Sequence, residues 1–142
     1  LIPANRSGYE QMETELKRQG VTDIIPMQIP YGHAHVDGLL NFASNDLVFL
    51  HAMQVPYEVV DTLKKKGYEI VETPSLTETK YGYATNFVAI EPGHVVSGSL
   101  APRSVELLEK HGIKVDVLDL SELNKGRGSV HCMTAFLKRD AQ

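Results

Sequence analysis

The 142-residue chain is 42% hydrophobic and 23% charged, and its formal net charge is −4. This composition is typical of a globular protein with a real core, which excludes a disordered chain. The sequence has no basic run, no zinc-finger spacing and no apolar stretch near the ~20 residues that span a bilayer, so neither nucleic acid nor a membrane is an expected partner. The single cysteine, Cys132, favours a reducing, cytoplasmic location.

The first 30 residues predict a helix followed by a strand, from Tyr9 to Met27. The chain begins with Leu1 instead of methionine, in a stretch that resembles the end of a strand. We therefore expect a fragment, a processed product or one piece of a split protein.

Each of three predicted helices ends with cationic residues, which a glycine and a β-rich stretch then follow. The glycines are Gly20, Gly67 and Gly112, at spacings of 47 and 45 residues. Glycine readily adopts the left-handed conformation that ends a helix, and cations suit the negative helix end. This recurrence predicts a repeated structural unit.

The second and third of these helices each follow a predicted hairpin. The stretches "VDGLLNFASNDLVFL" and "NFVAIEPGHVVSG" each give two strands around a turn, and Pro56 and Pro102 then open the helices. The unit is strand, strand, helix, strand, so the fold class is α/β. Open strand edges invite unwanted pairing, so we expect further units outside this chain. The expected single domain, 1–142, comprises units at about 1–30, 31–76 and 84–120 and a final strand over 128–138.

The stretch "YGHAHVDG" places His33, His35 and Asp37 on alternate positions of an expected strand, so their side chains share a face. From the residues alone this is a metal clamp, a general base with its carboxylate, or an ordinary strand end. The pattern matches the start of the metallo-β-lactamase-like signature, but Gly38 stands where that signature needs another histidine.

The C-terminal stretch "NKGRGSVHCMTAFLKRD" brings a glycine-rich approach to an expected strand that carries Cys132. Glycines at 126 and 128 bracket Arg127 and let backbone N–H groups come close to a ligand. A thiol activated by nearby cations or a base is a nucleophile, whereas a lone cysteine is more often a small buried hydrophobe. Residue type alone favours the buried alternative.

Three stretches together resemble the guanidino-group-modifying (pentein) superfamily, which includes arginine and agmatine deiminases, dimethylarginine dimethylaminohydrolases and amidinotransferases. "GRGSVHCMT" resembles its nucleophile strand, "HVDGLLNF" its His-x-Asp strand, and "NFVAIEPGHVVSG" with "LLEKHGIKV" the preceding segment of arginine deiminases. The resemblance implies a pseudo-fivefold α/β propeller of ββαβ modules, the same unit that the repeat predicts. This chain would hold two and a half to three modules.

The resemblance also implies roles for individual residues. Cys132 matches the nucleophile, His35 the general acid and base, and Asp37 a catalytic and substrate-binding carboxylate that grips the guanidinium. Arg127 would bind a substrate carboxylate, with a solvated loop arginine as the alternative. We expect Asn86 to be structural.

His131 neighbours the nucleophile, but adjacent residues of the expected strand face opposite ways, so we expect it not to be catalytic. The superfamily's early-module acidic residue, often near a Gly-Gly-Asp stretch, has no counterpart here. The substrate clamp is therefore incomplete, and we expect a homo-oligomer or a complementing chain.

The predicted function is a hydrolase that cleaves a C–N bond of a small guanidino compound of the arginine, methylarginine or agmatine type. Catalysis is expected to be covalent and to need neither cofactor nor metal. The alternatives are an amidinotransferase with the same nucleophile and a truncated, non-catalytic binding module.

Overall fold

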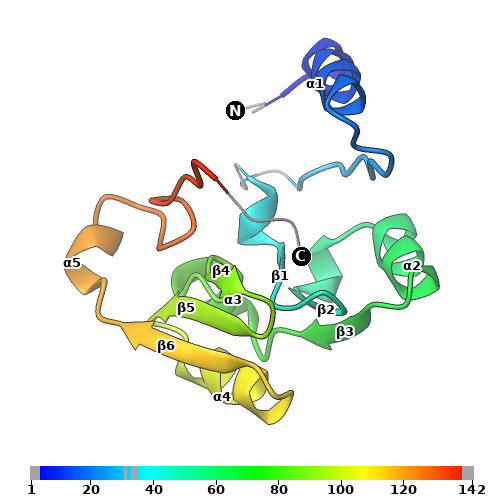
Figure 1. Ribbon diagram of the computed structural model, residues 1–142. Helices are drawn as coiled ribbons and strands as arrows, with labels where there is room; N and C mark the ends of the chain where they lie inside the picture. Colours follow the sequence, from blue (N-terminus) through cyan, green and yellow to red (C-terminus); the bar gives the residue numbers. More distant parts are fainter. Residues whose placement is uncertain (1–3, 31, 33–34, 139–142) are drawn as a thin grey trace.

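The computed structural model describes residues 4–30, 32 and 35–138, and it contains two three-stranded sheets flanked by helices (Figure 1). Of the described helices, none is both long and apolar enough to cross a membrane. The helices are α1 (Arg6–Arg18), α2 (Tyr57–Lys65), α3 (Leu76–Tyr81), α4 (Pro102–Lys110) and α5 (Ser121–Asn124). The strands are β1 (Leu40–Phe42), β2 (Leu47–Leu50), β3 (Glu69–Glu72), β4 (Val88–Glu91), β5 (His94–Gly98) and β6 (Lys114–Leu118).

The two sheets have the same connectivity. In the first, β1 is antiparallel to β2 and β2 is parallel to β3, with α2 between β2 and β3 in the chain. In the second, β4, β5 and β6 repeat this arrangement around α4. The strand, strand, helix, strand order agrees with the two full units predicted from the sequence. The total number of modules and their closure into a propeller stay predictions.

The helix-ending glycines adopt the predicted conformation. Gly20, Gly67 and Gly112 have φ angles of 90°, 88° and 79°, in the left-handed region. Pro102 is the first residue of α4, and Pro56 precedes the first residue of α2. These local signals explain why the repeat could be predicted from the sequence.

Strand β2 is the centre of the packing because all of its residues are buried. Alternate residues of a strand point to opposite faces. Val48 and Leu50 join a cluster with Leu63 of α2, whereas Phe49 joins a second cluster that includes Phe87 beside β4. The Phe49 and Phe87 ring centroids lie 6.4 Å apart. The second cluster therefore connects the two sheets across β2.

Two predicted strands are wrong. Residues 21–27 have no regular secondary structure, and the segment 128–138 forms a turn over 130–133 instead of a strand. Proline lacks the N–H that a sheet ladder needs, and Pro26 lies inside the first of these segments with Pro30 just beyond it. The curled path of the second segment places the cysteine, as described below.

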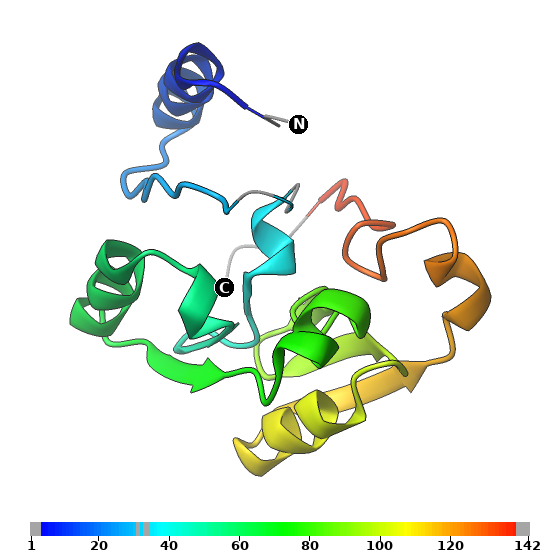
Figure 2. The ribbon, with the colours of Figure 1, turned by 180° about the vertical axis from the view of Figure 1, so that it is seen from behind.

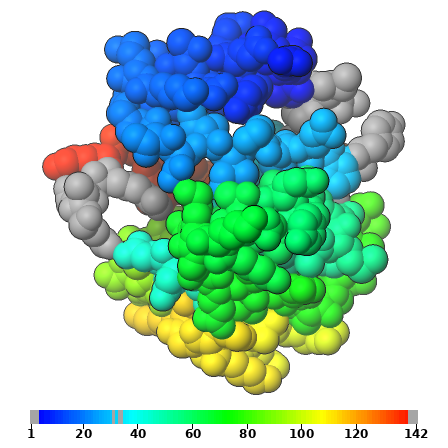
Figure 3. All heavy atoms as spheres, turned by 90° about the vertical axis from the view of Figure 1, so that its right-hand side faces the viewer, coloured from blue at the N-terminus to red at the C-terminus, as the bar shows by residue number. Residues whose placement is uncertain are grey.

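Helix α1 lies apart from the two sheets, at the opposite end of the molecule from α4 (Figures 1, 2 and 3). No residue of α1 is buried. The helix is stabilised by contacts within itself: hydrogen bonds from Lys17 and Arg18 lower the pKa values of Glu13 and Glu15, respectively. Its basic last turn also suits the negative end of the helix dipole.

Helix α3, which the sequence pattern does not predict, caps the start of α4. Ala101 precedes α4 and has no side chain that could cap it. The Glu78 carboxylate accepts hydrogen bonds from the Ser104 N–H at 2.8 Å, the Ser104 hydroxyl at 2.7 Å and the Arg103 N–H at 3.3 Å. A carboxylate here satisfies free N–H groups and matches the positive end of the helix dipole.

Replacing Glu78 should therefore destabilise the fold. We expect Glu78→Ala to lower the free energy of unfolding by about 2 kcal/mol, because it removes charge-assisted hydrogen bonds at a helix start. Glu78→Gln, which keeps an acceptor oxygen, should lose less. Chemical denaturation followed by circular dichroism measures the change. The control is Glu106→Ala on the exposed face of α4, for which we expect a change below about 0.5 kcal/mol. Equal effects of Glu78→Ala and Glu106→Ala would contradict the capping role.

Candidate active site

His35 and Asp37 lie at a short 3₁₀ helix, Val36–Gly38, that leads into β1. The predicted strand at this position is wrong: His35 is the extended residue before the 3₁₀ helix, and Asp37 lies within it. Leu39, which follows, is fully buried, and its carbonyl accepts the His51 N–H at 2.9 Å. The burial of Leu39 and this hydrogen bond hold the 3₁₀ helix against the first sheet. The side chains of His35 and Asp37 nevertheless lie close together, as described below.

Cys132 lies on the turn that replaces the predicted final strand. The Met133 N–H bonds to the Ser129 carbonyl at 3.2 Å, and the Thr134 N–H bonds to the His131 carbonyl at 3.1 Å. Neighbouring residues in such a turn do not face opposite ways, as they would in a strand. The expectation that His131 points away from the site is therefore wrong, because that expectation depended on the strand.

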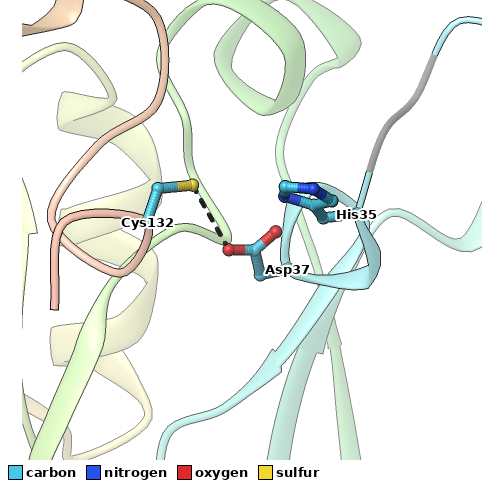
Figure 4. Close-up of side chains that lie close together, drawn as sticks. All are labelled: His35, Asp37 and Cys132. Atoms are coloured by element: carbon cyan, nitrogen blue, oxygen red, sulfur yellow. Dashed lines mark hydrogen bonds between the residues drawn. The ribbon is translucent and has the colours of Figure 1, made fainter. Parts of the chain in front are cut away.

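The three residues assigned to catalysis converge. One nitrogen, oxygen or sulfur atom from each of His35, Asp37 and Cys132 lies within 4.8 Å of the other two. Figure 4 shows the three side chains close together. The Cys132 thiol donates to Asp37 Oδ2 at 3.4 Å. His35 and Cys132 are exposed and Asp37 is partly buried. Residues 95 positions apart in the chain thus meet at a solvent-accessible site.

Asp37 Oδ2 accepts hydrogen bonds from three side chains. Its donors are Asn86 Nδ2 at 2.9 Å, His131 Nδ1 at 2.8 Å and Cys132 Sγ at 3.4 Å. Within the described part of the chain, no donor bonds to the other oxygen, Oδ1. Oδ1 is therefore the Asp37 oxygen that can accept an N–H from a ligand without displacing one of these protein contacts.

The sequence pattern does not predict that Asn86 contacts Cys132. Its side-chain nitrogen donates to Cys132 Sγ at 3.0 Å, and its side-chain oxygen accepts the Cys132 N–H at 3.2 Å. Asn86 is 3% exposed, so its amide is shielded from water. One signal was present: the Asn-Phe pair at 86–87 follows the pair at 41–42 by 45 residues, in phase with the repeat.

The other predicted residues do not join this cluster. Arg127 is exposed, has a left-handed φ of 70°, and makes no side-chain hydrogen bond to His35, Asp37 or Cys132 in the described chain. His33, named in the metal alternative, lies outside the described residues. His35, Asp37 and Cys132 are close enough to hold one ion between them, as His, carboxylate and thiolate ligands do for zinc. We assign no metal to them.

The backbone at Gly128 packs closely against the Cys132 side chain. Gly128 has a left-handed φ of 83°, and a Cβ there would lie 3.0 Å from Cys132 Cβ and 3.4 Å from Sγ. We expect Gly128→Ala to lower the free energy of unfolding by at least about 1–2 kcal/mol, because alanine is strained in this conformation and crowds the cysteine.

The matched control is Gly126→Ala, whose Cβ would meet only the Leu123 carbonyl oxygen, at 3.4 Å, among the described residues. Chemical denaturation of both variants measures the difference. A Gly128→Ala protein as stable as Gly126→Ala would show that the turn is not held as described.

Comparisons with solved structures establish the fold class. An amidinotransferase from Microseira wollei superposes with a TM-score of 0.74 at 19% identity, covering 98% of this chain and 40% of that one. The inosamine-phosphate amidinotransferase of Streptomyces griseus gives 0.72 at 23% identity, covering 93% of this chain and 41% of that one. A Pseudomonas aeruginosa dimethylarginine dimethylaminohydrolase, in complex with citrulline, gives 0.65 at 22% identity, with coverages of 89% and 45%.

Sequence comparisons give the family. The arginine deiminase from Lactococcus lactis subsp. lactis (strain IL1403) is 45% identical over 56 residues, which are 39% of this chain and 14% of that enzyme. The Bacillus subtilis (strain 168) protein YkgA is 26% identical over 116 residues, or 82% of this chain and 40% of its own length. The chain therefore spans less than half the length of these relatives. The family model for arginine deiminase matches residues 40–139, so the chain belongs to the arginine deiminase family, within the pentein superfamily.

Proposed function

We propose that this chain carries the nucleophile side of an active site that hydrolyses a C–N bond in a small guanidino compound. The substrate is of the arginine, methylarginine or agmatine type. One observation carries the proposal: His35 and Asp37 come from one segment and Cys132 from another, distant one, and the three meet within 4.8 Å. A nucleophile, a proton carrier and a carboxylate for a cation are the groups that this chemistry needs.

Substrate binding begins at the free oxygen of Asp37. A guanidinium is a planar cation whose N–H groups form short, charge-assisted hydrogen bonds to carboxylates. Asp37 Oδ1 can accept one of these bonds while Oδ2 keeps its protein donors. The guanidinium carbon then lies between Cys132 and His35, which are on either side of Asp37 in Figure 4.

Covalent catalysis follows in two steps. The thiol proton passes to His35, and the sulfur attacks the guanidinium carbon to form an S–C bond. His35 returns the proton to the departing nitrogen as the C–N bond breaks, which leaves a thiouronium adduct on Cys132. His35 next takes a proton from water, and the water oxygen attacks the same carbon. The C–S bond breaks, the proton on His35 returns to the sulfur, and the remaining O–H proton is released to solvent, which leaves a urea-type product and the free thiol. The cation favours thiolate formation because it offsets the negative charge of the sulfur.

Amidino transfer is the second candidate. It uses the same adduct, with an amine in place of water as the acceptor, and two of the similar structures are amidinotransferases. The exposed Cys132 leaves room for either acceptor. The non-catalytic binding module is the third candidate, and thiol reactivity separates it from both enzymes.

The rest of the clamp is proposed to come from outside this chain. His35 and Cys132 are exposed, and the chain spans less than half of its relatives. A second copy or a complementing chain would cover this side and supply the missing acidic group. Arg127 is proposed to bind a substrate carboxylate, and the single cysteine supports a cytoplasmic location.

Labelling of Cys132 tests the function directly, because it is the chain's only cysteine. We expect the cation 2-chloroacetamidine to alkylate it roughly ten- to a hundredfold faster than neutral 2-chloroacetamide, after both rates are normalised to those of glutathione. The preference arises from a charge-assisted hydrogen bond to Asp37. Intact mass spectrometry over time measures both rates.

Asp37→Asn is the matched variant, since it preserves shape and removes the charge. It should abolish most of the preference for the amidine. A normalised rate ratio near one in the unmodified protein would favour the inert binding module over the enzyme.

A further inference from the structure

We propose that Asn86 is a positioning residue that holds the Cys132 sulfur against Asp37 and stabilises the negative charge that forms on the sulfur. The thiolate is the nucleophile of the proposed function, and to that extent the inference rests on it. The observation that carries it is a set of three contacts between Asn86 and Cys132 or Asp37, made by one buried amide.

The contacts form a compact triangle of atoms. Asn86 Nδ2 lies 2.9 Å from Asp37 Oδ2 and 3.0 Å from Cys132 Sγ, and the sulfur lies 3.4 Å from the same oxygen. Asn86 Oδ1 also receives the Cys132 backbone N–H. The amide thus fixes the cysteine at both its backbone and its side chain, and it ties both to the carboxylate.

The charges explain why a donor is needed at this position. When the thiol loses its proton, a negative sulfur is left beside a negative carboxylate oxygen, and like charges this close disfavour ionisation. An N–H donor that bonds to both atoms offsets this repulsion without adding a charge. Asn86 is the described side chain that donates to both of them.

Asn86 is itself held in place from the first unit. The side-chain amide of Asn41 donates to the carbonyls of Thr85 and Phe87, at 3.0 and 2.8 Å, on either side of Asn86. The Thr85 hydroxyl donates to the Asp37 carbonyl at 2.8 Å, and the Phe87 side chain is fully buried. The loop is fixed before a substrate arrives, as expected of a group that preorganises a site.

A purely structural role would predict a different result from a role at the sulfur. If the amide only ties the loop to the turn, its loss lowers stability and leaves the ionisation of Cys132 unchanged. If it stabilises the thiolate, its loss moves the pH profile of thiol reactivity. The titratable groups around the sulfur are Asp37, His35 and His131, so their protonation is followed over the same pH range.

The test measures the rate at which neutral 2-chloroacetamide alkylates Cys132 between about pH 5 and pH 10, with EDTA present, in the full chain. For Asn86→Ala we expect a rate about tenfold lower at pH 7 and a midpoint about one pH unit higher, as one lost hydrogen bond to a charged group predicts. Asn86→Asp has the same shape but replaces the donor by a carboxylate, so its rate should fall further.

Thr79→Val is the control, because it removes buried hydrogen bonds to Thr73 and Ser75 without touching the sulfur, Asp37 or Asn86. It should lower the unfolding temperature and leave the pH midpoint within about 0.3 units of the unmodified protein. Circular dichroism confirms folding of each variant, and Asn86→Ser replaces any Asn86 variant that does not fold.

The proposal is overturned if folded Asn86 variants keep the unmodified pH profile, or if Thr79→Val shifts it equally. This outcome is independent of the proposed function. If the unmodified protein shows no preference for 2-chloroacetamidine over 2-chloroacetamide, the guanidino chemistry alone is contradicted. If the Asn86 variants keep the pH profile of Cys132 alkylation, the positioning role alone is contradicted.

Discussion

A single oxygen atom, Asp37 Oδ2, joins the three segments on which the candidate site depends. It accepts hydrogen bonds from the loop before β4, through Asn86, and from the C-terminal turn, through His131 and Cys132. A partly buried carboxylate requires such donors, because removing its charge from water without them is costly. The bonds that satisfy this charge therefore also place Cys132, the proposed nucleophile.

The packing around β2 makes this convergence possible. Phe49 on one face of β2 and Phe87 beside β4 belong to one buried cluster, so the loop that contains Asn86 has a fixed position relative to the first sheet. His35 and Cys132 nevertheless remain exposed. This exposure is compatible with the proposed function, in which this chain supplies the nucleophile and a second chain supplies the rest of the substrate clamp.

Local signals in the sequence predicted much of the fold and less of the site. Gly67, Gly112 and the hairpin turns adopt conformations that depend on neighbouring residues in the chain, so the two repeated units could be predicted. The strand expected around Cys132 was wrong because apolar residues there suggested extension, whereas backbone bonds curl the chain. The repeat of the Asn-Phe pair marked Asn86 but not its contact with Cys132, because no local pattern links an amide to a thiol 46 residues away.

The most direct test of the central claim is the intact mass of the protein after incubation with arginine, a methylarginine or agmatine and rapid acid quenching. The account predicts an adduct on Cys132 in the unmodified chain, supplemented with the complementing chain where one co-purifies, and none in Cys132→Ser. The mass of the adduct separates the candidate reactions. Loss of ammonia or a small amine from the substrate indicates a deiminase-type hydrolase, and transfer of the amidino group alone indicates an amidinotransferase. An adduct on another residue, or product formation that persists in Cys132→Ser, would contradict the assignment of Cys132 as the nucleophile.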